Sequence, residues 1–157
     1  MDTTEVKEPY DSAQDALAHI AHVQANMSTI INELLKRADN HDQSKLYSPE
    51  KETYDKYIPM LKETKYGSQE YFDIKMKMEK EGLKHHFEAN RHHPEHFKNK
   101  IDDMNLVDVI EMFIDWYSAS LRSDTGFEKG LAINIKKFNI SPQLANIINN
   151  TFEDFFK

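Results

Sequence analysis

Histidine is the residue type that could do the most chemistry in this chain. Eight of the 157 residues are His, and five of these fall between His85 and His96. Cys is absent, so disulfides, thiolate nucleophiles and Cys-ligated zinc or iron–sulfur sites are excluded. Imidazole and carboxylate groups together suit Mn, Fe, Co, Ni and Zn. Any metal site must therefore be built from His, Asp and Glu.

A first candidate pair lies on the helix predicted over residues 12–37. On a helical wheel, His19 lies about 65° from the centre of the apolar stripe and His22 about 125° from it. His19 is therefore expected to face inward and His22 outward. Asp15 precedes His19 by one turn on the same face, so the two side chains can converge on one point. Alternatively, Asp15 complements the helix dipole. The stripe itself consists of apolar residues at helical spacing: Ile20, Val23, Met27, Ile30, Ile31 and Leu34.

A second candidate is the His41-Asp42 pair, which follows the predicted end of that helix. Adjacent His and Asp side chains at a helix end can both turn toward one metal ion, and the Asp can bridge to a second ion. A His-Asp dipeptide is common by chance. Two further features support this pair as a candidate metal site, namely Lys45, three residues after the Asp, and the His-rich segment downstream.

That His-rich segment follows the helix predicted over residues 69–90. With Phe72, Met76, Leu83 and Phe87 as the buried face, His86 points toward the core and His85 away from it. His92, His93 and His96 come next, at the junction of helix and loop. We expect metal ligands here, and the alternative is a solvated polar turn.

An acidic stripe on the helix predicted over residues 106–121 is the last candidate. Asp108, Glu111 and Asp115 recur at i, i+3 and i+7, which is also the pattern of an ordinary solvated face. Asp115, however, is flanked by apolar residues on both sides. An ionised carboxylate in such surroundings needs a partner, and a metal ion would supply one.

These candidates must be positioned by helices. No segment alternates with period two between hairpin turns, so we predict an all-α fold, a compact single-domain bundle of about six helices. Residues 1–10 are expected to form a flexible arm, and 11–157 one domain. The predicted helices span residues 12–37, 49–61, 69–90, 106–121, 127–138 and 141–156.

Net charge and hydropathy limit the classes of molecule that this chain is expected to bind. The net charge is −7, from 27 acidic and 20 basic residues, and no basic block stands out, which disfavours polymeric nucleic acid. The sequence has no run of eighteen apolar residues and its first residues are polar, which disfavours a membrane partner. A cytoplasmic location is expected.

The order of the candidates resembles the H…HD…H…H…D signature of the HD-domain metal-dependent phosphohydrolases. The string His41 to Lys45, HDQSK, is similar to the HD-x-G-K motif of the HD-GYP cyclic-dinucleotide phosphodiesterases, with Ser44 in place of Gly. Together with NRHHPEHF, it also resembles an uncharacterised family of small phage and bacterial HD-like proteins. The Gly-Tyr-Pro motif of the HD-GYP proteins is absent.

The resemblance implies a fold of the HD-domain type with one, two or three divalent transition-metal ions, and a binuclear centre is expected. Asp42 would bridge the ions and Lys45 would contact phosphate, with both acting in catalysis. The choice of ligands among His85, His86, His92, His93 and His96 stays open. The implied ligand set is Asp15, His19, His41, Asp42, His86, His92, His93 and Asp115.

The chemistry that the resemblance implies is hydrolysis of a small phosphate ester. Metal-bound water has a lowered pKa and can attack phosphorus as hydroxide. The expected substrate is a nucleotide, whether a monophosphate, a triphosphate or a cyclic phosphodiester. Two alternatives remain, namely an HD-fold di-iron oxygenase and a non-catalytic protein that sequesters a nucleotide or a metal ion.

Overall fold

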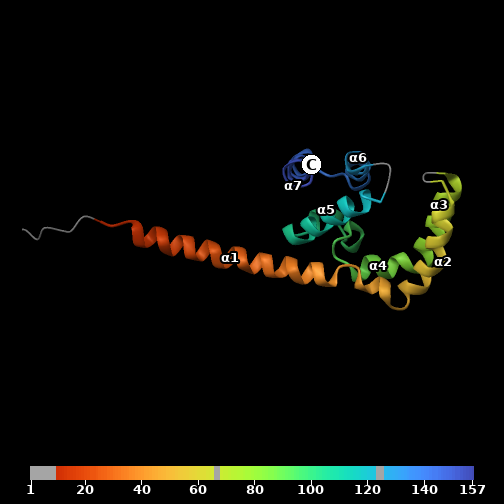
Figure 1. Cartoon of the computed structure of the whole chain (residues 1–157), viewed down its shortest axis with the longest axis horizontal. Coiled ribbons are helices and arrows are strands. Elements are labelled where there is room, and N and C mark those ends of the chain that lie inside the picture. The colour runs from red at the N-terminus through yellow and green to blue at the C-terminus, as the bar shows by residue number, and fades with distance from the viewer. Residues whose placement is uncertain (1–9, 66–67, 123–125) are drawn as a thin grey trace, which may run out of the picture.

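The structure is a computed structural model that describes residues 10–65, 68–122 and 126–157. Helices dominate these ranges, which contain no strand (Figure 1). The predicted all-α fold is thus confirmed, while most of the predicted arm lies outside the described residues. The helices are α1 (Ala13–Asn40), α2 (Glu50–Glu63), α3 (Gln69–Met78), α4 (Lys84–Ala89), α5 (Leu106–Ser120), α6 (Phe127–Phe138) and α7 (Pro142–Phe155).

Local capping explains where several helices begin. The side chain of Ser68 accepts a hydrogen bond from the backbone N–H of Tyr71 at the start of α3. Asn105 accepts one from the N–H of Asp108 at the start of α5, and the Asp108 carboxylate accepts one from the N–H of Asn105. Such bonds satisfy N–H groups that have no partner within the helix. These boundaries are therefore encoded locally.

Two apolar clusters form the core. The first joins α5, α6 and α7 through buried residues such as Met112, Phe113 and Phe127. The second joins α2 and α3 through Tyr57, Ile74 and Met78. The end of α1, helix α4 and two 3-10 turns (Gln43–Leu46 and Pro94–His96) connect these regions. Most of the predicted ligands lie within or between these connecting segments, namely His41, Asp42, His86, His92 and His93.

The helix predicted over residues 69–90 is interrupted by a π-helical turn at Glu79–Leu83. Its buried positions recur every four residues, at Ile74, Met78, Gly82 and His86. Four residues of a regular α-helix overshoot a full turn by about 40°, so the wider π turn keeps these positions on one face. The predicted burial of Phe72 and Met76 is wrong, since they are 52% and 57% exposed.

Gly82 is required by close packing inside this turn. A Cβ atom at this position would lie 2.6 Å from Thr53 Cβ and 2.7 Å from Thr53 Cγ2. We expect Gly82→Ala to lower the free energy of unfolding by about 1–3 kcal/mol, the usual cost of overpacking. Urea denaturation measures this change.

Gly130 provides the matched control, because a Cβ atom there would meet nothing within 4 Å. Gly130 lies in α6, where Gly→Ala should raise stability by about 0.5–1 kcal/mol. Equal stability of the two variants would contradict the close approach of Gly82 to Thr53.

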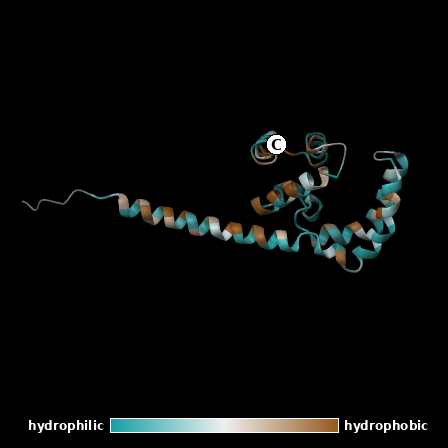
Figure 2. Cartoon of the chain, in the orientation of Figure 1, coloured by the Kyte–Doolittle hydropathy of each residue, from teal (hydrophilic) through white to brown (hydrophobic). Residues whose placement is uncertain are grey.

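Helix α1 is unlike the rest of the fold. It has 28 residues, none of them buried, and its N-terminal part projects away from the other helices (Figure 1). The predicted inward stripe is wrong for this part, because Ile20, Val23, Met27 and Ile30 are 41–59% exposed. Figure 2 shows hydrophobic residues, in brown, at intervals along the projecting helix. Neither α1 nor any other described helix is long and apolar enough to cross a membrane.

Candidate metal centre

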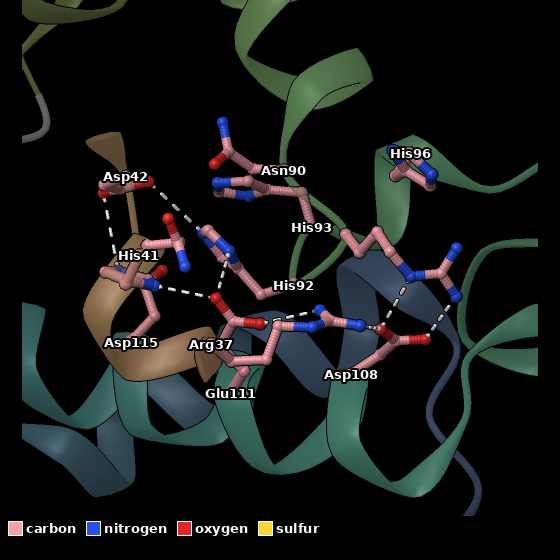
Figure 3. Close-up of polar contacts among 12 residues, drawn as sticks. Arg37, His41, Asp42, Asn90, His92, His93, His96, Asp108, Glu111 and Asp115 are labelled. Carbon is pink, nitrogen blue, oxygen red and sulfur yellow. Dashed lines mark hydrogen bonds and ion pairs between the residues drawn. The ribbon is translucent and has the colours of Figure 1, made fainter. Parts of the chain in front are cut away.

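The centre begins where α1 ends. His41 leaves the helix with ψ 124°, and Asp42 then adopts a left-handed conformation with φ 56°. Asp is among the few non-Gly residues that enter this region readily. The reversal turns both side chains toward α5 and the loop after α4 (Figure 3).

Two overlapping groups of side chains could each hold a metal ion. Asp42 and His92 belong to both groups, which places them at the middle of the cluster. Within each group, the candidate ligand atoms lie within 4.8 Å of one another. One group is Asp42, His86, His92 and His93, and the other is His41, Asp42, His92 and Asp115.

Two buried atoms at the middle of the cluster lack hydrogen-bond partners among the described residues. They are Asp42 Oδ1 and His92 Nε2, which lie 3.5 Å apart. His86 Nε2 is also 3.5 Å from Asp42 Oδ1. Leaving such atoms unsatisfied costs about 1–3 kcal/mol each. A metal ion coordinated by them would remove this cost, so the donor set fits a metal centre.

Buried carboxylates orient three of the imidazole rings. Glu111 Oε1 lies 3.0 Å from Nδ1 of His41 and 3.1 Å from Nδ1 of His92. Glu50 Oε2 lies 2.9 Å from Nδ1 of His86. A ring that donates its Nδ1–H to a carboxylate presents the Nε2 lone pair to a metal. In all three rings, Nε2 faces Asp42 at 3.5 Å.

Sequence reasoning missed the role of both carboxylates. Glu111 belongs to the acidic stripe, but its pattern is that of a solvated face, whereas its side chain is only 11% exposed. Glu50 is completely buried and accepts a hydrogen bond from Ser44 Oγ at 2.9 Å. In the sequence, Glu50 resembles any acidic residue in a first helical turn, and only its contacts with the distant His residues identify it.

Arginines compensate the carboxylate charge behind the rings. Arg37 donates to Glu111 Oε2 at 3.0 Å and to Asp108 Oδ1 at 3.1 Å. Arg91 contacts both oxygens of Asp108, at 3.1 and 2.9 Å. Burial alone would raise the pKa of Glu111, but His41, His92 and Arg37 hold that pKa well below its usual range. This network ties the end of α1 to α5.

The protonation states of the rings differ. Contacts with Asp115 and Glu111 raise the pKa of His41 to about 10. Without metal, this ring is therefore protonated on both nitrogens and positively charged. Burial, together with the neighbouring rings of His92 and His86, lowers the pKa of His93 to about 3. His93 therefore stays neutral and keeps a lone pair for coordination.

Six of the eight predicted ligands come together in the cluster. Lys45 also lies at this cluster, where its ammonium group forms an ion pair with Asp42 Oδ2. His85 and His96 belong to neither group. His85 contacts Glu50, and His96 contacts the carbonyl oxygen of Phe87. The clustered ligands are His41, Asp42, His86, His92, His93 and Asp115.

The structure contradicts the prediction that Asp15 and His19 are ligands of this centre. Both are exposed in the projecting part of α1, and 22 residues separate His19 from His41 on one continuous helix. At 1.5 Å per residue this separation is about 33 Å. The prediction of these two residues as ligands of the same centre is wrong, because the helix does not fold back onto the cluster.

Glu111 gives a testable prediction as a positioning residue. We expect Glu111→Ala to weaken metal binding by roughly 10–100-fold, because His41 and His92 lose the acceptor that orients them. Calorimetric titration of the metal-free chain with Mn²⁺ or Zn²⁺ measures the change. Glu88→Ala, which alters an exposed carboxylate on α4, is the control and should bind metal normally. Unchanged affinity in Glu111→Ala would contradict the orienting role.

Comparisons with known proteins assign the chain to a family. Neither a comparison with curated proteins nor one with solved structures found a significant match. One family model, described as a family of unknown function (DUF5662), matches residues 8–154. This match includes every residue of the candidate metal centre and nearly the whole length of the chain. The chain therefore belongs to the family of unknown function DUF5662.

Proposed function

We propose that this protein is a metal-dependent phosphohydrolase with two divalent transition-metal ions. The observation that carries the proposal is the position of Asp42, which is shared by both ligand groups and has a buried Oδ1 without a hydrogen-bond partner among the described residues. A carboxylate shared in this way is the natural bridge between two ions. Two-metal centres are a common device of phosphatases and nucleases.

The donor set supports the assignment of ligands. His86 and His93 would hold one ion, His41 and Asp115 the other, with Asp42 between them and His92 within reach of both. Nitrogen and oxygen donors without sulfur fit Mn, Fe, Co, Ni or Zn. When bound, such ions supply an activated water and neutralise charge that develops on phosphoryl oxygens.

Lys45 is the residue we assign to the phosphate group. Its side chain is 32% exposed and its ammonium group lies at Asp42, next to the cluster. Its Nζ is also 5.1 Å from the centre of the Tyr54 ring. A compact ammonium at the edge of the centre is suited to bind a phosphate oxygen. Arg91 is committed to Asp108, so it is the weaker candidate for this role.

The substrate class follows from charge and size. With a net charge of −7, the chain is poorly suited to a polymeric polyanion. A small phosphate ester, specifically a nucleotide, needs only the positive charge that the ions and Lys45 supply within the site. It does not have to contact the rest of the negatively charged surface. We place this reaction in the cytoplasm.

Phosphate release tests the proposal. Metal-free protein is supplied with Mn²⁺, Fe²⁺, Co²⁺, Ni²⁺ or Zn²⁺ and offered nucleoside mono-, tri- and cyclic phosphates, the last with a phosphatase to release the product phosphate. We expect metal-dependent turnover of one nucleotide class that a chelator abolishes. Oxygen-dependent turnover with iron alone would replace the proposal with an oxygenase. Stoichiometric nucleotide binding without product would replace it with a sequestering protein.

A further inference from the structure

The projecting part of α1 has the composition of a buried helix. Among residues 13–32 only Asp15 is charged, and five residues are Ala. Helices in water usually present a charged face, and helices of this length owe most of their stability to packing. Yet every residue from 13 to 32 is exposed in the single chain. A partner is therefore missing from this segment.

The apolar positions follow the spacing of a coiled coil. Steps of four and three residues alternate along the face, which is a repeat of 3.5 residues and keeps one seam toward a partner helix. Leu17 and Ile31 flank this seam and are 65% and 51% exposed. The seam consists of Ala16, Ile20, Val23, Met27, Ile30 and Leu34.

Helix α5 already covers the C-terminal end of the same seam. Leu34 is half-buried, and Arg37, one heptad after Ile30, bonds to Asp108 and Glu111 of α5. α5 runs parallel to α1, since Arg37 contacts Asp108 and His41 contacts Asp115 four and seven residues further along the two segments, and α5 begins only at Leu106. Nothing described covers the seam on the N-terminal side of that point, so the open face continues an existing helix–helix interface.

We propose that a second copy of this chain covers the open seam, with the two α1 helices antiparallel and centred near Ala25. In this arrangement Ile20 lies opposite Ile30 of the partner subunit, and Val23 lies opposite Met27 of the partner subunit. A parallel pair is disfavoured because both α5 helices would then crowd onto the same end of the seam. The antiparallel pair has two-fold symmetry, and each partner presents the same surface.

The area available matches a stable dimer. Pairing over residues 13–34 covers about 30 Å of helix. At the end of the seam, Leu106 and Ile110 of α5 are 79% and 40% exposed, and the N-terminal end of the partner helix would reach them. Together these surfaces approach the roughly 800 Å² per partner that stable interfaces bury.

Mass measurement of the full chain tests the dimer. Light scattering after size exclusion should give twice the 18.4 kDa of one chain. Val23→Glu, which places a charge in the seam, should give 18.4 kDa with the helical circular dichroism of a folded protein. Thr29→Glu adds the same charge on the opposite face of α1 and should remain a dimer. A monomeric unmodified chain, or equal dissociation of both variants, would overturn the proposal.

Cross-linking tests the orientation without relying on a destabilised variant. The chain has no Cys, so a single introduced Cys can form a disulfide only with the same residue of another copy. Gln24→Cys should form a disulfide between copies because position 24 lies near the two-fold axis. Ile31→Cys, one heptad later on the same side of the seam, should not, because the two positions lie about 18 Å apart along the antiparallel pair. Cross-linking of both variants would show a parallel pair. Absence of cross-linking in both variants would exclude pairing along this seam.

Discussion

Replacing Asp42 with alanine is expected to abolish binding of divalent metal ions. Asp42 is the one carboxylate common to both groups of candidate ligands, so its loss would remove a donor from each of the two proposed ions at once. The loss should exceed the roughly 10–100-fold typical of a residue that only orients a ligand. Calorimetric titration of the metal-free chain with Mn²⁺ or Zn²⁺, followed by elemental analysis, measures the effect.

Two control variants separate this effect from general damage. Asp39→Ala removes an exposed carboxylate three residues earlier, and His19→Ala removes the exposed imidazole far along α1. Both should bind metal as the unmodified chain does. If His19→Ala lost as much metal as Asp42→Ala, the placement of the centre at the end of α1 would be wrong.

Replacing Lys45 with alanine is expected to lower kcat for phosphate release by about 10²–10³-fold, the usual cost of removing one group that stabilises developing charge. Metal binding should persist, because Lys45 is not among the candidate ligands and its ion pair with Asp42 would compete with coordination of the proposed ions. Steady-state kinetics of phosphate release, with metal content measured on the same sample, separate the two effects.

Lys51→Ala is the matched control for Lys45→Ala. Lys51 lies nearby on α2, where its ammonium group contacts the exposed Asp55, and its loss should leave turnover unchanged. A normal rate in Lys45→Ala would refute its assigned contact with phosphate. Loss of metal together with turnover would show instead that Lys45 supports the centre itself.

Most helix positions could be predicted from the sequence because their signals are local. Ser68, Asn105 and Ser141 accept hydrogen bonds at helix starts, and these residue types are recognisable as caps. The π turn could not be predicted in the same way. It lies where Gly82 approaches Thr53 too closely for a Cβ atom, and this is a tertiary approach between two helical segments that local spacing does not reveal.

The candidate metal site could be predicted in part for a similar reason. The pairs His41-Asp42 and His92-His93 are adjacent in sequence, and Asp115 stands out against its apolar neighbours. Glu50 carries no such mark, because its partners lie 35 and 36 residues away. Local spacing therefore identified most of the candidate ligands but not the carboxylates that orient their rings.

The error over Asp15 and His19 has a physical cause. The wheel argument assumes that the apolar stripe of α1 faces the core of its own chain. In the structure α5 covers only the end of that stripe, and Ile20 and Val23 remain 49% and 41% exposed. An amphipathic pattern identifies a face that is to be buried, but not the surface that buries it.

The metal content of the purified chain tests the two-metal centre most directly. Untagged protein is stripped with a chelator, reconstituted with each transition metal in turn, freed of excess metal and measured by elemental analysis. We predict about two equivalents per chain for at least one metal, and almost none for Asp42→Ala. Reconstituted protein that retains no metal would contradict the centre and leave the His cluster with a structural role only.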